Sequence, residues 1–252
     1  MKILEAWPPA MKKSLILIEA VHAERYRQLH LLLEAGVDVN CQDPNTGHTS
    51  LIRAMFVENP RQRRRMVKTL INYGGKIEKS DVDGRTALAW ACCLARNDII
   101  RFFLRAIHLD IGLNSVDKYG NNNLMLACTS GNPNTVHLIA EAFRQANIDV
   151  NRRNLNGENA LMYAHRLGFY DCVKVLVEGG YVRTSMSKEL LYGDERKVMS
   201  TIAAPSILHS SNNEITLPQI FSMYSDHLTD SFPRSLSKQC SLKSLSNRKH
   251  CK

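Results

Sequence analysis

The chain has 252 residues, 44% apolar but only 7% aromatic, and this balance favours a helical globular protein over a large all-β architecture. Its formal net charge is +9 and its isoelectric point is near 9.3, so an anionic partner enters as one hypothesis. No stretch approaches the roughly 18 consecutive apolar residues of a membrane span, so no transmembrane helix is predicted.

Residues 1–11 are predicted to be a lead-in to the folded domain. The next segment, 11–23, has the basic start, apolar run and small-residue end of a secretory signal peptide. Glu19 interrupts that run, and the same residues fit the repeat described below, so we predict a helix of the domain instead. The seven cysteines follow no disulfide-scaffold spacing. They predict free thiols in a reducing compartment, the cytoplasm or the nucleus.

A unit of 36 or 37 residues recurs along the chain. Each copy begins with a glycine, followed by a leucine four residues later and an alanine three beyond that. The four glycines are Gly47, Gly84, Gly120 and Gly157. The leucine and alanine pairs are Leu51 and Ala54, Leu88 and Ala91, Leu124 and Ala127, and Leu161 and Ala164. Leu17 and Ala20 continue the series 34 residues earlier, which makes five units and predicts a solenoid.

The residue types within each unit predict two helices. The glycine permits a turn with positive φ, and a threonine or asparagine two residues later is a good helix N-cap. Leucine and alanine three apart then share one face of a short first helix. A polar break follows, and a second helix carries paired apolar residues. Since no unit can bury its apolar face alone, stacking against neighbouring units must supply the core.

These spacings, caps and exit sequences resemble the ankyrin repeat over residues 12–180. The resemblance implies an all-α solenoid of helix–turn–helix units joined by short loop or hairpin tips. The sequence departs from the family after each N-cap, where the usual proline and histidine are missing. We therefore expect the hydrogen bonds of that histidine to be replaced by apolar stacking. The expected unit boundaries are 12–42, 43–80, 81–116, 117–153 and 154–180.

Two units are irregular. The second unit carries a predicted insertion of about four residues between its helices, within 58–68. Its basic residues, Arg61, Arg63, Arg64, Arg65 and Lys68, are interpreted as a solvated loop, with an import signal or a contact with an acidic partner as alternatives. The third and fourth units are expected to extend their second helices by about three residues.

The composition changes after Gly180. Residues 181–200 are predicted to include a capping helix, and 201–252 to form a disordered, serine-rich basic tail. A basic residue precedes Ser237, Ser241 and Ser246 by three positions, which makes these serines candidates for phosphorylation.

Catalytic signatures are missing from the sequence: no phosphate-binding loop, dinucleotide fingerprint, nucleophile elbow or zinc-protease motif occurs. No C-x-x-C pair is present, so neither a metal nor a cofactor is predicted. Trp90 falls at a core position of a first helix, where packing is expected. Because no catalytic signature is present and neither a metal nor a cofactor is predicted, we predict that the protein is not an enzyme.

The resemblance implies that protein partners contact the loop tips and the exposed flank of the first helices. By position, the candidates are Phe56, Arg85, Leu94, Lys118, Tyr119, Asn121, Thr129, Leu155, Asn156, Glu158 and Arg166. We predict an adaptor or scaffold that binds a protein partner and is itself a monomer.

Two other functions remain open at this point. The segment 215–228 resembles the Leu-Pro part of a SOCS box, which would make the protein a substrate receptor of a ubiquitin ligase. The net positive charge would also suit weak nucleic-acid binding, but the basic residues of 1–180 are spread widely and no binding module is evident.

Overall fold

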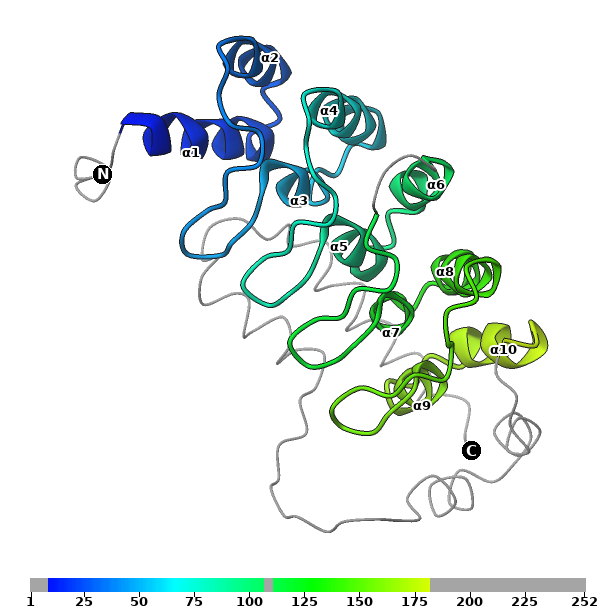
Figure 1. Ribbon diagram of the computed structural model, residues 1–252. Helices are drawn as coiled ribbons and strands as arrows, with labels where there is room; N and C mark the ends of the chain where they lie inside the picture. The colour runs from blue at the N-terminus through cyan, green and yellow to red at the C-terminus, as the bar shows by residue number, and fades with distance from the viewer. Residues whose placement is uncertain (1–8, 107–110, 182–252) are drawn as a thin grey trace, which may run out of the picture. The chain divides into compact units, whose positions relative to one another are not determined.

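The computed structural model describes residues 9–106 and 111–181, with side chains from residue 15 onward, and these residues belong to one compact unit (Figure 1). They form helices only, apart from two isolated β-bridges, so the predicted all-α solenoid is confirmed. The helices form five consecutive pairs: α1 Pro9–His22 and α2 Tyr26–Glu34, α3 Ser50–Ala54 and α4 Pro60–Asn72, α5 Ala87–Cys93 and α6 Asn97–Arg105, α7 Asn123–Thr129 and α8 Pro133–Gln145, and α9 Ala160–Arg166 and α10 Tyr170–Glu178.

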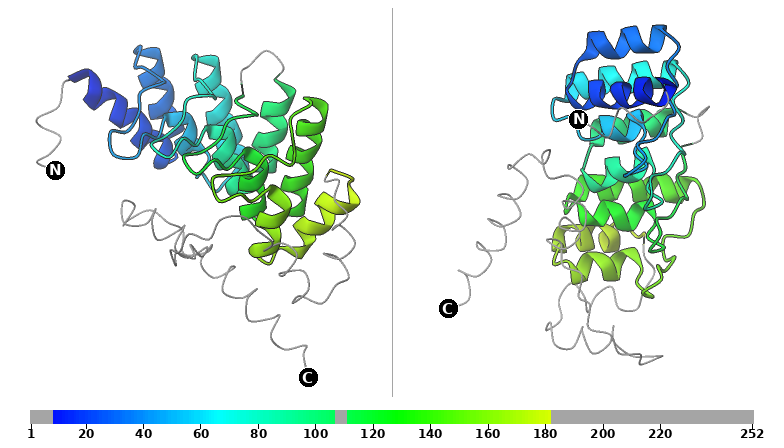
Figure 2. Two further views of the ribbon diagram at one scale, coloured as in Figure 1. Left: turned by 60° about the horizontal axis from the view of Figure 1, so that its bottom comes forward. Right: turned by 90° about the vertical axis from the view of Figure 1, so that its left-hand side faces the viewer.

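The helices of this unit lie in two layers. The first helices, α1, α3, α5, α7 and α9, form an inner row, and the second helices form an outer row beside it (Figures 1 and 2). The long connections between pairs all project on the side away from the outer row. The tips of these connections, with the inner helices, are the part of the molecule that carries the candidate residues.

Four inner helices begin at the predicted N-caps. The side-chain oxygen of Thr49, Thr86, Asn122 or Asn159 accepts a hydrogen bond from the backbone N–H three residues later, at 2.9–3.2 Å. Each bond satisfies a backbone donor that the helix itself cannot, and each contributes about 1 kcal/mol. The caps thus set where every one of these short helices starts.

The repeated apolar residues are buried as predicted. The five leucines of the inner helices, from Leu17 to Leu161, have exposed fractions of at most 2%, and the paired alanines are equally buried. Alanine at that position lets the neighbouring inner helix approach closely. The outer helices add larger side chains, including Phe103 and Phe143, to the same core.

The outer helices correct two sequence-based expectations. Arg61 to Lys68 lie within α4, which has 13 residues, so the basic insertion of the second unit is helical and not a loop. Asn59 caps this helix and Pro60 occupies its first position, which favours starting the helix here. The second expectation was that the third and fourth units extend their second helices. Helix α8 of the fourth unit does have 13 residues, whereas α6 of the third unit ends at Arg105 because Ala106 leaves the helical region.

The expected capping helix within 181–200 and the expected disordered tail of 201–252 lie outside the described residues, except for Tyr181. The hydroxyl of Tyr181 hydrogen-bonds to Nδ1 of His137 on α8 at 2.9 Å. The candidate phosphorylation sites Ser237, Ser241 and Ser246 and the SOCS-like segment 215–228 also lie outside the described residues.

Candidate protein-binding surface

Each loop tip is closed by the side chain of its first residue. Oδ1 of Asp81 accepts hydrogen bonds from the backbone N–H groups of Asp83 and Arg85, both at 2.9 Å. Asp117 and Asn154 make the same pair of bonds one and two units later. An aspartate or asparagine that bonds its own following backbone in this way favours a tight turn. The tips are therefore ordered by local chemistry.

Neighbouring tips are joined by backbone hydrogen bonds. The N–H of Val82 donates to the carbonyl of Thr46 at 3.3 Å, and the N–H of Lys118 donates to the carbonyl of Asp83 at 2.8 Å. The N–H of Leu155 donates to the carbonyl of Tyr119 at 3.0 Å. These bonds hold four successive tips side by side as one rigid edge.

Glycine is required where two tips approach each other most closely. Gly47 has φ of +69°, and a Cβ atom there would lie 2.7 Å from the backbone nitrogen of Val82. Any other residue would meet both a strained backbone and a backbone atom that cannot move aside. A Cβ atom at Gly84 or Gly120 would also lie within 3.2 Å of the next tip's backbone, so packing between tips as well as the turn explains the repeated glycine in these three units. At Gly157 only the turn requires it.

A row of buried polar side chains connects the units beneath these tips. We call it the turn ladder: Nε2 of His48 lies 3.6 Å from Oδ2 of Asp81, Arg85 lies 3.5 Å from Asp117, and Nδ2 of Asn154 donates to Oδ1 of Asn121 at 2.8 Å. In each step, the residue before one N-cap contacts the first tip residue of the next unit. Polar contacts therefore join the units in addition to the expected apolar stacking.

Asp81 is a highly connected carboxylate of the turn ladder. Its Oδ2 also accepts a hydrogen bond from Nε1 of Trp90 at 2.7 Å. Burial by itself would raise the pKa of Asp81, but the bonds from His48, Trp90 and the backbone of Arg85 outweigh it and hold this pKa below its ordinary value. Asp81 is thus stabilised in its ionised form.

Two of the candidate residues belong to the turn ladder and not to the exposed tips. Arg85 and Asn121 each have an exposed fraction of 6%, which corrects the expectation that their side chains are available at the surface. The guanidinium of Arg85 lies 5.3 Å from the ring of Trp90 as well as near Asp117. Sequence position placed these two residues at a tip, but contacts with the next unit turn them inward.

An aromatic cluster occupies the inner helix face in the second and third units. The ring of Phe56 lies 5.0 Å from that of Trp90 and 5.7 Å from that of His48, measured between centroids. Phe56 is half-buried, so it combines packing between units with an accessible edge. Trp90 is buried, which agrees with its predicted packing role.

The fifth unit presents charged groups on the same face. Arg166 makes a bidentate contact with Glu158, with Nε to Oε1 at 2.6 Å and Nη2 to Oε2 at 3.1 Å. The guanidinium of Arg166 also lies 4.9 Å from the ring of Tyr163. Burial raises the pKa of Tyr163 to about 12, so its hydroxyl stays protonated at neutral pH.

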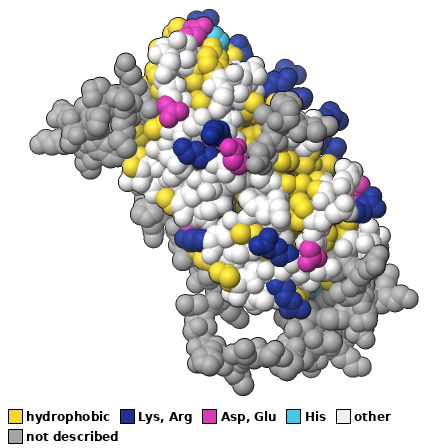
Figure 3. All heavy atoms as spheres, in the orientation of Figure 1, with side chains coloured by type: hydrophobic (Ala, Val, Ile, Leu, Met, Phe, Trp, Pro, Cys, Tyr) yellow, Lys and Arg dark blue, Asp and Glu magenta, His cyan; other side chains and the backbone are white. Residues whose placement is uncertain are grey.

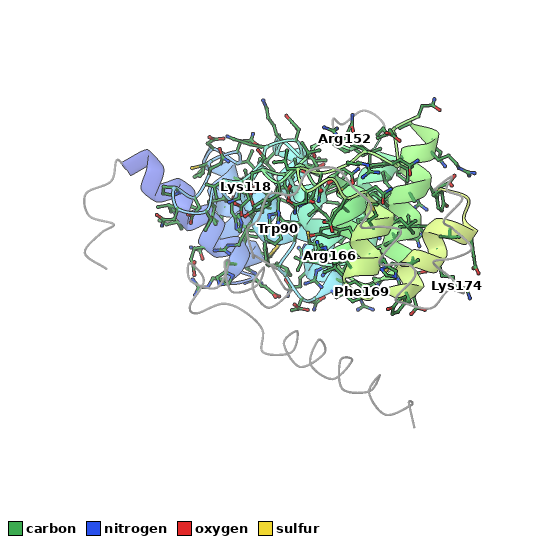
Figure 4. All side chains as sticks on the ribbon, turned by 90° about the horizontal axis from the view of Figure 1, so that it is seen from below. Trp90, Lys118, Arg152, Arg166, Phe169 and Lys174 are labelled. Carbon is green, nitrogen blue, oxygen red and sulfur yellow. The ribbon has the colours of Figure 1, made fainter. Side chains whose placement is uncertain are left out.

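The tips of the fourth and fifth units hold the most accessible candidates. Lys118 is half-exposed, forms an ion pair with Asp83 and lies 5.1 Å from the ring of Tyr119. Leu155 is 78% exposed, and Asn156 is exposed beside it. Trp90, Lys118 and Arg166, which come from three successive units, are labelled in the view from below (Figure 4).

The remaining two candidates lie at the ends of inner helices. Leu94 caps the C-terminus of α5 and is half-buried, and the hydroxyl of Thr129 donates to the carbonyl of Leu126 at 2.6 Å. The residue of the third unit in register with Phe56, Thr129 and Arg166 is Cys93, and the predicted candidate Leu94 is its neighbour. Counting two residues from each repeated alanine would have found Cys93.

Nine of the predicted candidates are exposed or half-buried and lie outside the turn ladder, and we call these nine residues the front face. They are Phe56, Leu94, Lys118, Tyr119, Thr129, Leu155, Asn156, Glu158 and Arg166. Apolar and aromatic groups mark its second and third units, and ion pairs mark its fourth and fifth. Whether they bind a partner stays a prediction.

Neither a metal centre nor a membrane span is found in the described part of the chain. No group of three His, Cys, Asp or Glu side chains there could hold a metal ion. The five described cysteines form no disulfide, and burial raises the pKa of Cys92 and Cys128 well above the ordinary thiol value. None of the helices in residues 9–106 and 111–181 is both long and apolar enough to cross a membrane.

Comparison with known proteins agrees with this architecture. The family model for ankyrin repeats in three copies matches residues 17–115 and 107–185. "Ankyrin repeat domain-containing protein 63" of Mus musculus is 27% identical over 162 residues, which cover 63% of this chain and 40% of that protein. The Homo sapiens protein of the same name is also 27% identical, over 63% of this chain and 41% of its own length.

A second relative is similar over a shorter stretch. "Inversin" of Danio rerio is 41% identical over 64 residues, which are 25% of this chain and 6% of that protein. The chain therefore spans less than half the length of these curated relatives. Ankyrin repeats generally serve as protein-interaction modules and are typically non-catalytic. Because the family model matches more than half of the chain and the structure has the corresponding stacked helical pairs, the chain belongs to the ankyrin-repeat family.

Proposed function

We propose that this protein is a non-catalytic adaptor that binds a protein partner through the front face. The family supplies the general function, since ankyrin repeats are interaction modules. The finer proposal rests on one observation: accessible side chains from four units are presented at the ends of inner helices and on loop tips that backbone hydrogen bonds lock to one another. A surface ordered before binding loses little conformational entropy when a partner docks.

The chemistry of the front face suits a partner with an apolar segment beside a polar one. The half-buried Phe56 and Leu94 offer apolar contact in the second and third units. Leu155 adds an exposed apolar group at a tip. Tyr119 adds an aromatic ring at the neighbouring tip, and aromatic rings are the kind of side chain in which binding energy concentrates. The ion pairs of Lys118 with Asp83 and of Arg166 with Glu158 surround them with oriented charges.

The proposal is tested with the full chain as bait in an affinity purification. In the test variant, Lys118, Tyr119 and Leu155 are replaced by Ala. These side chains are accessible, so folding should be retained, and circular dichroism checks it. A matched control replaces the exposed residues Asn72, Lys76 and Lys174 by Ala.

A partner of the front face should be retained by the native chain and the control and lost by the test variant. With the purified partner, we expect the three substitutions to weaken binding by about thirtyfold or more, measured by calorimetry. Equal affinity of the test and control variants for every retained protein would contradict the proposal.

Two further predictions accompany this function. Phosphorylation of Ser237, Ser241 and Ser246 would add negative charge to the C-terminal segment and so regulate binding. Cytoplasmic or nuclear location and a monomeric state also stay predictions, which fluorescence microscopy and sedimentation would check.

A further inference from the structure

A second surface of the molecule is strongly basic. Seven cationic side chains on the outer helices α2, α4 and α6 are exposed, and we call them the outer basic face. They are Arg27, Arg61, Arg64, Arg65, Lys68, Arg101 and Arg105. In the space-filling view, dark-blue side chains recur along the upper right border, the side on which Figure 1 places these helices (Figure 3). Since α4 packs between α2 and α6, the three helices present one continuous surface.

The charges of the outer basic face are not neutralised by neighbouring carboxylates. Among the described residues, none of the seven cations forms a salt bridge. The nearby carboxylates have other partners: Asp98 pairs with the buried Arg63 at 2.8 Å, and Glu58 pairs with Arg96 at 3.2 Å. The arginine cluster therefore divides into one structural residue, Arg63, and several exposed ones without a counter-charge.

This arrangement costs α4 local stability. Arg61 lies in the first turn, where the helix dipole disfavours positive charge, and that turn contains no acidic residue. Arg61 and Arg64 are three residues apart, and Arg64 and Lys68 are four apart, so like charges adjoin along one side of the helix. Residues that break a local rule without structural compensation are expected at functional sites. A bound anion would relieve both costs.

Aromatic contacts between the helices orient two of these cations. The guanidinium of Arg65 lies 3.6 Å from the ring centroid of Tyr26 on α2, and the ammonium of Lys68 lies 6.0 Å from that of Phe102 on α6. Tyr26 is held in turn by a hydrogen bond of its hydroxyl to Thr69 at 3.0 Å. Both contacts bridge two helices, so they fix these charges relative to the outer row.

We propose that the outer basic face binds an acidic peptide segment of a protein partner, separately from the front face. Six of the seven cations are arginine, whose planar fork matches a carboxylate with two parallel hydrogen bonds. Arg61, Arg64 and Lys68 are spaced by about 4.5–6 Å along α4, close to the roughly 6.6 Å between alternate side chains of an extended peptide. Successive acidic side chains of such a segment can therefore meet successive cations.

Two other occupants fit less well. Single-stranded nucleic acid is usually bound through open aromatic platforms, whereas Arg65 covers the ring of Tyr26 and Phe102 is half-buried. Residues 181–252 of this chain contain ten Lys or Arg and six scattered Asp or Glu, so they offer no acidic run to occupy the surface. The partner segment is therefore assigned to another protein.

The test measures binding of a fluorescein-labelled twelve-residue peptide that alternates Glu and Ser to the full chain, by fluorescence anisotropy. The outer variant carries Arg61→Gln, Arg64→Gln and Arg101→Gln, three exposed positions whose side chains make no hydrogen bond or ion pair in the described structure. The control variant, K76Q/R144Q/K174Q, removes the same charge elsewhere. A peptide with Gln in place of Glu, a single-stranded RNA and phosphatidylserine vesicles are measured in parallel.

We expect the Glu peptide to bind the native chain and the control variant with equal affinity. It should bind the outer variant about tenfold more weakly. Binding should also weaken as salt rises from about 50 to 200 mM, because exposed charges are screened. Equal weakening in the two variants, or equal binding of the Gln peptide, would overturn the proposal. Tighter binding of the RNA or the vesicles that is lost in the outer variant would overturn the assignment to an acidic peptide. The front-face substitutions leave this assay unaffected, so the two proposals fail independently.

Discussion

The front face and the outer basic face both carry arginine and lysine, but they differ in how those charges are held. On the front face, Lys118 pairs with Asp83 and Arg166 pairs with Glu158. On the outer basic face, seven cations have no carboxylate partner among the described residues. Paired charges contribute orientation and specificity, whereas unpaired charges create a field that attracts an anion and is screened by salt. The same array of stacked units thus supports two kinds of surface.

Both faces depend on the same core, so breaking that core should have the largest effect. Leu124 is fully buried in the inner row, and Leu124→Ala should lower the free energy of unfolding by about 4 kcal/mol. The matched change Leu155→Ala, at an exposed tip, should change it by less than about 0.5 kcal/mol. Urea denaturation of the two variants measures both values. Similar losses in the two would contradict the described packing.

The turn ladder should contribute nearly as much as the core. Asp117→Ala removes the carboxylate that faces the buried Arg85 and accepts two backbone N–H groups, so we expect a loss of about 3 kcal/mol in unfolding free energy. Asp149→Ala, at an exposed position, is the control. If the two variants unfold at the same urea concentration, the ladder does not join the units.

Acid should weaken the turn ladder at Asp81. Its pKa is lower in the folded chain than in the unfolded chain, so its contribution to stability is fully present above the unfolded value of about 4. That contribution is lost as the pH falls from there through the folded pKa. Urea denaturation between about pH 5 and 2 should show a shallower loss for Asp81→Asn than for the native chain. Identical pH profiles would show that Asp81 is not the group responsible.

The smallest change in unfolding free energy is expected from substitutions on the outer basic face. Unlike the changes above, it should not lower stability. The R61Q/R64Q/R101Q variant removes repulsion between like charges, and glutamine has a helix propensity similar to that of arginine, so the unfolding free energy should stay equal or rise by up to about 0.5 kcal/mol. Thermal unfolding at low salt measures it. A clear loss of stability would mean that these arginines have a structural role, and the comparison between the two faces would fail.

The sequence predicted the fold well but the functional surface only partly. Spacing identified five units, the N-caps of four of them, and the buried leucine and alanine columns, because all of these follow from local backbone chemistry and helical periodicity. It misplaced Arg85 and Asn121, since the contacts that turn them inward come from the next unit, 32 or 33 residues away. It also treated the basic insertion as a loop, although Asn59 and Pro60 together start a helix there.

Residue order alone therefore determined what repeats in this protein: the turn, the cap, the short inner helix and the need for a neighbour. Only the tertiary structure decided which polar side chains join the units and which remain available to a partner. The physical reason is that caps and turns are satisfied within a few residues. The burial and pairing of a charge depend instead on what the adjoining unit places beside it. Arg63 and Arg64 show this, since neighbours in the chain differ completely in burial and in partners.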